Sequence, residues 1–285
     1  MIRDALGNRE YWEKWTTFAE WAIEHKKDEA RKPAVDKEYE PQYVYGIKNK
    51  YRELMLYRYS RGDPVSELGQ YFPLLMDMWE EAERLGKDVW SPDTQFTRHT
   101  WRVNKDFYMD SFWLVGLALA LEIPDDQWQR LLGLIGNEGE DILLDRIIAS
   151  RAPGRKIGDK LLFPKPYRHL LAAVDAPQDK QPAKLLHFLE RWYPELAGGR
   201  DIMSKPYWYN SYPDLEIGGG YFGHWCLEAV AAAKAFGLDD SQCLGHPHYP
   251  GDLLRPNGPS THPPRPEAEL KPAKAGWLAK LFGKR

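Results

Sequence analysis

Apolar residues recur every three or four positions along most of this chain, the spacing that places them on one face of an α-helix. Alternating runs of β-branched residues, the pattern of a half-buried strand, never reach four residues. The sequence therefore predicts an all-α fold, a bundle-like array of many helices. The expected helices cover residues 8–32, 41–60, 64–86, 104–122, 124–136, 141–150, 163–174, 182–193 and 221–237.

Capping residues and helix stops set several of these boundaries. The run Gly62-Asp63-Pro64 predicts that the glycine ends one helix, the aspartate caps the next and the proline takes its first position. Pro73 is a candidate kink in that helix, and residues 90–94 are expected to form a loop. Asn8 is expected to cap the first helix, whose buried face would carry Tyr11, Trp12, Trp15, Phe18, Ala19 and Ala22.

A weak internal repeat predicts two related helical halves that pack side by side. A helix of small apolar residues begins at Phe112 and ends in an acidic turn at 125–126, and a similar helix begins at His224 and ends at 239–240. We therefore place an N-terminal half at residues 8–122 and a C-terminal half at 123–256. Residues 257–285 are expected to form a proline-rich linker and a short basic amphipathic segment, which either frays or docks on an acidic surface.

Cysteine content and the length of the apolar runs indicate the cellular compartment of the protein. Its two cysteines do not make a disulfide framework, and the N-terminus lacks an apolar run ahead of a cleavage site. The longest nearly uniform apolar stretch, 112–121, is too short to span a bilayer. We therefore expect a cytoplasmic protein without a membrane span.

Charge is distributed unevenly along a chain whose net charge is only −3. Residues 62–150 hold 7 Lys and Arg against 17 Asp and Glu, which gives this acidic block a net charge of −10. One interpretation is a set of solvated helix faces, and the other is a surface that attracts and orients a basic partner. Direct binding of nucleic acid is disfavoured, because phosphates would meet like charge.

Catalytic motifs are largely missing from the sequence. It has no nucleophile–base pair and no G-x-S-x-G element, and the glycines at 218–220 lack the lysine and the spacing of a phosphate loop. A metal-dependent hydrolase could use His224, Glu228, His246 and His248. The nearby pattern Cys243-x2-His246-x-His248 has zinc-ligand residue types, but its spacing fits no standard zinc motif. This hydrolase stays as an alternative, and we expect no metal and no cofactor.

Acidic residues also occur next to one another, at 125–126, 138–141 and 239–240. We expect them to cap helices and complement helix dipoles rather than to act as acid and base. Glu228 differs, because it falls one turn after His224 in a helix whose other residues look buried. A buried carboxylate needs donors, so we expect a structural link to a tyrosine, histidine or arginine first, and a functional role second.

The stretch from Tyr221 to Leu253 carries three short motifs. They are an aromatic-Gly-aromatic-Trp-x-x-Glu helix start, a Leu-Asp-Asp-Ser turn and a Tyr-Pro-x-Asp-Leu strip; their residues are Tyr221, Gly223, Trp225, Glu228, Asp239, Asp240, Tyr249, Pro250 and Asp252. With these motifs the chain resembles the PoNi-like immunity proteins, cytoplasmic antidotes to PoNe-type DNase toxins of bacterial type VI secretion. The resemblance covers most of residues 10–255 and departs from the family at His224 and Gly251, where aromatic residues are usual.

The resemblance implies an all-helical inhibitor, not an enzyme, that binds a cognate nuclease toxin and blocks its active site. An acidic inhibitor surface would compete for the basic face that holds DNA. We expect the toxin to contact Glu138, Glu140, Asp141 and Asp145. Trp208 and Tyr212 form a second candidate surface, with a place in the core as the alternative. A helical scaffold for another basic protein stays open as a third interpretation.

Overall fold

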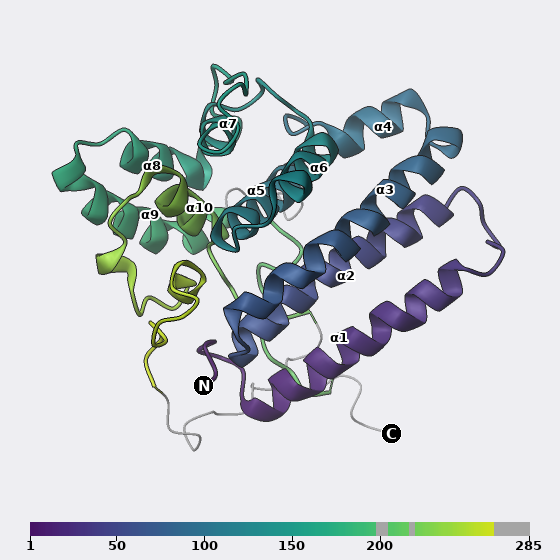
Figure 1. Ribbon diagram of the computed structural model, residues 1–285, viewed down its shortest axis with the longest axis horizontal. Helices are drawn as coiled ribbons and strands as arrows, with labels where there is room; N and C mark the ends of the chain where they lie inside the picture. Colours follow the sequence, from purple (N-terminus) through teal and green to yellow (C-terminus); the bar gives the residue numbers. More distant parts are fainter. Residues whose placement is uncertain (198–204, 217–219, 265–285) are drawn as a thin grey trace.

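The structure, a computed structural model, describes residues 1–197, 205–216 and 220–264, and Figure 1 shows the course of the chain. These residues form α-helices joined by 3-10 turns and loops, without a strand among them, so the all-α prediction is confirmed. The α-helices are α1 (Arg9–Ala30), α2 (Glu40–Arg61), α3 (Tyr71–Val89), α4 (Pro92–His99), α5 (Lys105–Ala120), α6 (Asp125–Ile135), α7 (Ile142–Ala149), α8 (Pro164–Val174), α9 (Gln181–Leu196) and α10 (Leu227–Phe236).

Local sequence explains many of the helix ends. The Asn8 side chain accepts a 2.7 Å hydrogen bond from the backbone nitrogen of Tyr11, and Asn104 caps α5 through an equivalent bond of 2.9 Å. Gly62 ends α2 and Gly237 ends α10, both in the left-handed conformation. These four helix ends lie where the sequence predicts them.

Between residues 62 and 99 the structure differs from the prediction. Asp63 caps no helix, because its carboxylate pairs with arginines of α2 and the 3-10 helix η1 (Val65–Gln70) precedes α3. Pro73 then falls in the first turn of α3, where a missing N–H costs no hydrogen bond, so no kink is required. Residues 92–94, expected in a loop, are the start of α4, because Ser91 accepts a 3.2 Å backbone hydrogen bond and acts as its N-cap.

Helices α1, α2 and α3 lie side by side with α2 in the middle, and α6 packs on α3 (Figure 1). Because α1 forms the edge of this layer, only the side that meets its neighbours is covered. Phe18, predicted on the buried face, is therefore 48% exposed.

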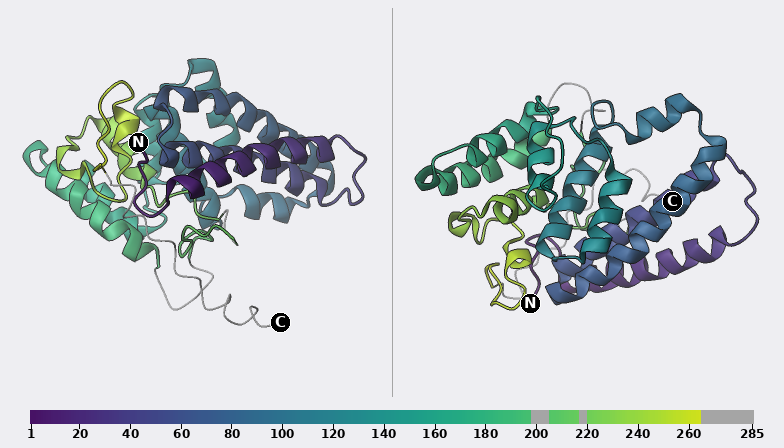
Figure 2. Two further views of the ribbon diagram at one scale, coloured as in Figure 1. Left: turned by 90° about the horizontal axis from the view of Figure 1, so that it is seen from below. Right: turned by 45° about the horizontal axis from the view of Figure 1, so that its top comes forward.

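Helices α7 to α10 form a second group, in which α8 packs on α9. This group meets the rest of the molecule where α10 lies against α5 (Figures 1 and 2). Because α5 and α10 are the two helices of the internal repeat, the prediction of two related halves packed side by side is confirmed. Their close approach requires Gly116, where a Cβ would sit 2.8 Å from the Leu227 carbonyl oxygen and 3.3 Å from the Ala231 Cβ. The boundary between residues 122 and 123 stays a prediction.

The sequence predicts a protein without a membrane span and with a basic C-terminal segment. In the ranges that the structure describes, every helix is too short or too polar to cross a bilayer. The basic amphipathic segment expected at the C-terminus, with the linker beyond residue 264, lies outside the described residues.

Candidate functional site

The motif that begins at Tyr221 fastens the chain before α10 to the N-terminal segment. The Tyr221 hydroxyl donates to Asp4 Oδ2 at 2.6 Å, and the Tyr221 carbonyl accepts from the Tyr11 hydroxyl at 2.6 Å. Asp4 also accepts from the backbone nitrogens of Leu6 and Gly7. Two segments more than 200 residues apart in sequence are thus joined by buried hydrogen bonds.

Gly223 and Trp225 join the same segment to the end of α2. Gly223 has a φ of +99°, which side chains rarely adopt, and a Cβ there would overlap the Trp225 ring. Trp225 Nε1 donates to Ser60 Oγ at 2.8 Å, and the Ser60 hydroxyl donates to the Phe222 carbonyl at 2.9 Å. The buried hydroxyl is satisfied both as donor and as acceptor, so these residues serve packing.

Glu228 is a buried carboxyl that links three helices. Its Oε1 accepts from the Tyr167 hydroxyl of α8 at 2.9 Å and from Trp192 Nε1 of α9 at 3.3 Å. Burial raises the pKa of Glu228, and the hydrogen bonds from these two donors oppose that rise. The helix starts only at Leu227, so His224 precedes it and does not lie one turn before Glu228, as expected from the sequence.

The three histidines of the hydrolase alternative belong to an aromatic stack. The Tyr193 ring lies 4.6 Å from the His224 ring and is stacked on the His248 ring at 5.1 Å. Burial lowers the pKa of His224 and of His248 to about 4, and it also lowers the pKa of His246. Within the described part of the chain, no three His, Cys, Asp or Glu side chains are placed to hold a metal ion together.

The Leu-Asp-Asp-Ser turn holds the last described segment in place. Asp239 accepts from the backbone nitrogen of Ser241 at 2.9 Å, as aspartates do in tight turns. Asp240 Oδ2 accepts from the Tyr249 hydroxyl at 2.6 Å and from Arg255 Nη1 at 2.8 Å. The two carboxylates therefore have different structural partners.

The final motif, Tyr-Pro-x-Asp-Leu, forms the 3-10 helix η5 (Gly251–Leu254), which Pro250 precedes. The Asp252 carboxylate accepts from Arg3 Nε at 2.6 Å and from Ser260 Oγ at 2.8 Å. It also accepts from the Thr261 backbone nitrogen at 2.6 Å. Burial opposes ionisation, but these donors outweigh it and lower the pKa of Asp252.

Two of the expected toxin contacts lie inside the protein. Asp141 and Asp145 have 0% exposure, which corrects the expectation that they face a partner. Asp141 is the N-cap of α7 and accepts from the Leu143 and Leu144 backbone nitrogens at 2.9 and 2.8 Å. Asp145 pairs with Arg155 at 2.7 Å. Their carboxylates thus organise the turn before α7.

Glu138 and Glu140 remain accessible. Glu138 is exposed and Glu140 is half-buried. Glu138 borders a hollow of about 710 Å³ between α6 and the chain after α7, which Arg151 and Arg155 also line. The two arginines reduce the negative potential beside Glu138.

The two aromatic candidates divide between core and surface. Trp208 is buried, with ring centroids 5.1 Å from Trp113 and 5.8 Å from Trp192, so it has the place in the core. Tyr212 is 56% exposed, with its ring edge-on to His224 at 6.0 Å. Only Tyr212 is accessible to a partner.

Most of the acidic block lies on the surface. Three of its 17 acidic residues, Asp110, Asp141 and Asp145, are buried. Helices α3 and α6 pack together and expose acids that we call the α3–α6 acidic face; its members are Asp77, Glu80, Asp125 and Asp126. Arg130 pairs with Asp77 at 2.6 Å and with Glu80, and Arg151 pairs with Asp125 at 2.6 Å. This face therefore retains a net charge of −2 from four acids and two arginines.

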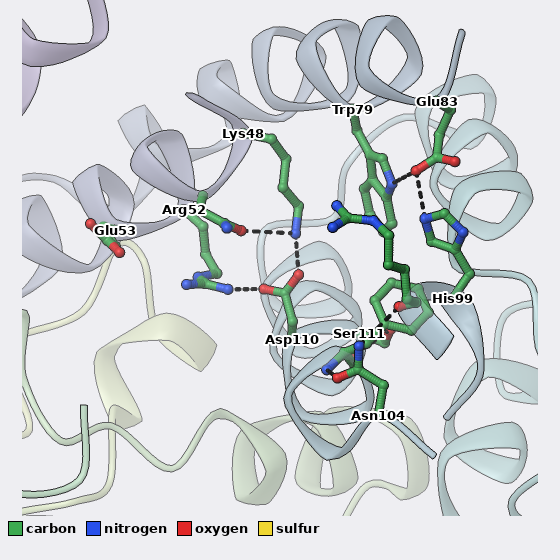
Figure 3. Close-up of polar contacts among 12 residues, drawn as sticks. Lys48, Arg52, Glu53, Trp79, Glu83, His99, Asn104, Asp110 and Ser111 are labelled. Atoms are coloured by element: carbon green, nitrogen blue, oxygen red, sulfur yellow. Dashed lines mark hydrogen bonds and ion pairs between the residues drawn. The ribbon is translucent and has the colours of Figure 1, made fainter. Parts of the chain in front are cut away.

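A buried ion cluster connects α2 to α5 (Figure 3). Lys48 and Arg52 reach from α2 to the Asp110 carboxylate on α5, each to a different oxygen. Burial lowers the pKa of Lys48 to about 8, opposed by Asp110. For Asp110, burial is outweighed by the two cations, which hold its pKa below the ordinary value. An ionised carboxylate paired to two cations makes a poor general base, so the cluster suits a structural role.

The cluster borders a pocket of about 240 Å³ between α2, α4 and the start of α5. Arg52 Nη2 donates to the Tyr207 hydroxyl at 2.9 Å, and that hydroxyl donates to Glu53 Oε1 at 3.2 Å. Arg98 and Asp106 also line the pocket.

Sequence reasoning misses the ion cluster and its pocket. The pattern that could have indicated it is a pair of cations four residues apart, Lys48 and Arg52, on a helix that also buries Tyr51 and Met55. Asp110, the last charged residue of a helix that is apolar from Phe112 onward, is the matching anion. Their pairing depends on how α2 packs on α5, which local spacing does not specify.

Comparison with known proteins places both halves in one family. A family model described as "PoNe immunity protein (PoNi), N-terminal" matches residues 3–133, and one described as "PoNe immunity proteins (PoNi), C-terminal" matches residues 139–253. No curated protein matches the chain. The crystal structure of protein PA2201 from Pseudomonas aeruginosa is similar at a TM-score of 0.59 and 18% identity, covering 88% of this chain and 97% of that one. At this identity the likeness shows the fold alone.

Proposed function

Because this chain belongs to the PoNe immunity proteins (PoNi) through both of its halves, it has an immunity role against a nuclease toxin, and we propose that it acts by masking the toxin's DNA-binding face. The toxin in this proposal is a DNase delivered by type VI secretion, and the immunity protein meets it in the cytoplasm of the cell that it protects.

The observation that carries the proposal is the acidic block of residues 62–150, with its net charge of −10. A protein that holds DNA presents positive potential to the phosphates, so a negative surface is attracted to the same face. The α3–α6 acidic face offers such a surface on two packed helices, Asp77 and Glu80 from one and Asp125 and Asp126 from the other. Glu138, Glu140 and Tyr212 are further proposed contacts.

The carboxyl groups that could have served catalysis have structural partners, which supports inhibition by binding alone. Asp110 is paired to two cations, Asp141 caps α7, and Glu228 is held by Tyr167 and Trp192. Each is buried and held by these partners, and Oε2 of Glu228 alone among these carboxylates has no hydrogen-bond partner in the described residues. An inhibitor that binds by complementary charge needs only the exposed acids.

Charge reversal on the α3–α6 acidic face tests the proposal. The triple variant Asp77→Lys, Glu80→Lys and Asp126→Lys should bind the toxin at least about 10-fold more slowly than the native protein at low salt, because electrostatic steering raises association rates by about 10 to 1,000-fold. Added salt should slow the native protein and leave the variant nearly unchanged. Stopped-flow association kinetics measure both effects.

A matched control reverses three exposed acids outside the block, Asp179, Glu190 and Glu216. This variant carries the same change in net charge and should retain most of the native association rate. If both variants slow equally, net charge alone is responsible. If neither slows, the acidic block does not steer the toxin.

A further inference from the structure

The outer edge of α1 carries a row of four aromatic rings, which we call the α1 stripe: Trp15, Phe18, Trp21 and His25. Trp21 is 57% exposed and Phe18 is 48% exposed, and their ring centroids lie 5.5 Å apart. The Trp21 ring is stacked on the His25 ring at 5.0 Å, and the Trp15 ring meets Phe18 edge-on at 5.4 Å. Single exposed aromatic residues are common, but adjacent ones indicate a surface that binds a partner.

The charges around the α1 stripe largely cancel. Towards the start of the helix, the exposed side chains of Glu10 and Glu13 are balanced by those of Arg9 and Lys14. Towards its end, three acids are each paired with a cation three residues further on, Glu24 with Lys27, Asp28 with Arg31 and Glu29 with Lys32. A partner of the α1 stripe is therefore held by apolar contact rather than by charge.

The chain itself has a segment of that chemistry beyond the described residues. Residues 275–285 hold four large apolar side chains, whereas residues 257–274 hold one, Leu270; the four are Trp277, Leu278, Leu281 and Phe282. Contact between this segment and the α1 stripe would remove apolar surface of both from water, which is favourable in proportion to the area covered.

The described part of the chain ends beside the start of α1. His262 is buried, with its Nε2 2.9 Å from the Tyr59 hydroxyl at the end of α2. The Arg3 guanidinium lies over the same Tyr59 ring at 4.8 Å, and α1 begins six residues after Arg3. Six residues span at most about 20 Å, and Trp21 lies about 18 Å along the helix from its start. Trp21 is therefore within about 40 Å of this point.

The apolar segment can reach the α1 stripe. From His262 to Trp277 the chain advances 15 positions, and an extended chain of that length spans about 50 Å. A short tether of this kind gives the segment an effective concentration in the millimolar range near the stripe. A second copy of the chain, at micromolar concentration in solution, would compete poorly with it.

We propose that residues 275–285 dock on the α1 stripe, with the Trp277 ring and the apolar side chains beside it covering Phe18 and Trp21. The contact is apolar, so added salt does not weaken it. This separates it from docking of the segment's cations on the α3–α6 acidic face, which salt would weaken. The proposal does not depend on how the protein binds a toxin.

The indole N–H signal of Trp21 in the nuclear magnetic resonance spectrum of the full-length protein reports on this contact. The variant Trp21→Phe identifies the signal by removing it. The triple variant Leu278→Ser, Leu281→Ser and Phe282→Ser removes apolar surface from the segment and should shift the signal, because the Trp21 ring loses its cover. A Trp21 signal that stays at its native position in the triple variant overturns the proposal.

Charge and self-association have their own controls. Lys280→Ser combined with Lys284→Ser should leave the Trp21 signal in place, and so should added salt. Equal shifts in this charge variant and in the apolar variant would mean that the cations make the contact, which contradicts the proposal. A Trp21 signal that moves when the native protein is diluted would mean that a second copy covers the α1 stripe, which contradicts it as well.

Trypsin cleavage after Lys280 tests the same contact from the side of the segment. Phe18→Ala combined with Trp21→Ala should make this cleavage several-fold faster, because the segment loses the surface that protects it. Both residues are exposed, so the helix should stay folded. Phe96→Ala, at an exposed ring on α4, is the matched control and should be cleaved at the native rate. Equal rates in the native protein and the α1 variant reject the α1 stripe as the docking site.

Discussion

Asp110 is the residue on which the contact between α2 and α5 depends most strongly, because it is the shared anion of two buried cations. Replacing it with Ala leaves Lys48 and Arg52 buried without their counter-ion. Removing one partner of a buried ion pair typically costs about 3–5 kcal/mol, and we expect the Asp110→Ala variant to lose that much stability.

Urea denaturation measures this loss. The control is Asp106→Ala, one turn earlier on the same helix, whose exposed carboxylate should cost less than about 1 kcal/mol. Similar losses in the two variants would mean that the buried cluster contributes no more than a surface charge.

The histidine stack predicts a loss of stability in mild acid. His224 and His248 have a folded-state pKa of about 4 against an ordinary 6.5, so the unfolded state gains protons first as the pH falls. Stability is therefore complete above pH 6.5 and is lost as the pH falls towards 4. At pH 5 the two groups together should lower the free energy of unfolding by about 2–4 kcal/mol relative to pH 7.5.

Chemical denaturation across this pH range provides the test. His262 is also buried with its pKa lowered to about 4, so His248→Gln removes one of three such groups and should reduce the dependence on pH by about a third. His25→Gln, at an exposed position, should preserve the dependence. A native protein equally stable at pH 5 and pH 7.5 would contradict the burial of neutral imidazoles.

At the scale of single residues, the sequence predicts those contacts whose two partners lie within a few positions of each other. Asn8 and Asn104 cap helices because the donors that they bind lie three residues ahead. Asp141 caps a helix too, but its burial depends on the packing of the chain around it, including a bond from the Leu162 backbone nitrogen. The same limit applies to Asp145, whose partner Arg155 lies ten residues away.

Among the helices, the contact between α5 and α10 is the most sensitive to side-chain size. Gly116→Val would place methyl groups against the Leu227 carbonyl and the Ala231 side chain, which lie where α10 crosses. Overpacking of this kind costs about 1–3 kcal/mol.

Gly133, in α6, is the matched control, because a Cβ there meets nothing within 4 Å. Gly133→Ala should raise stability by about 0.4–1 kcal/mol through the unfolded state. Thermal unfolding of both variants gives the comparison. A tolerated valine at position 116 would mean that the two helices are not in close contact.

Long periodic helices are predicted well from sequence, and short ones are not. The apolar spacing in α5 extends over 16 residues, whereas α4 has 8 residues and buries none of them fully. Without an apolar stripe, the Ser91-Pro92 start of α4 looks like the turn of a loop. Contacts between helices, such as the pairing that forms the pocket at Arg98, depend on packing that periodicity does not specify.

The molecule as a whole combines two packed helical halves with an acidic surface concentrated in the middle of its sequence. Burial removes Asp110, Asp141 and Asp145 from that surface, so the face available to a toxin is smaller than the charge count of the block indicates. The sequence predicts that this block exists, but the structure is needed to identify which acids are exposed.

The central claim, that the protein occupies the face on which a nuclease toxin holds DNA, is tested most directly by competition. A catalytically inactive form of the cognate toxin is bound to fluorescently labelled DNA, and the anisotropy is followed as this protein is added. We expect the DNA to be released in full at one equivalent, with a binding constant that weakens as salt is raised. A stable ternary complex that retains the DNA would contradict the claim.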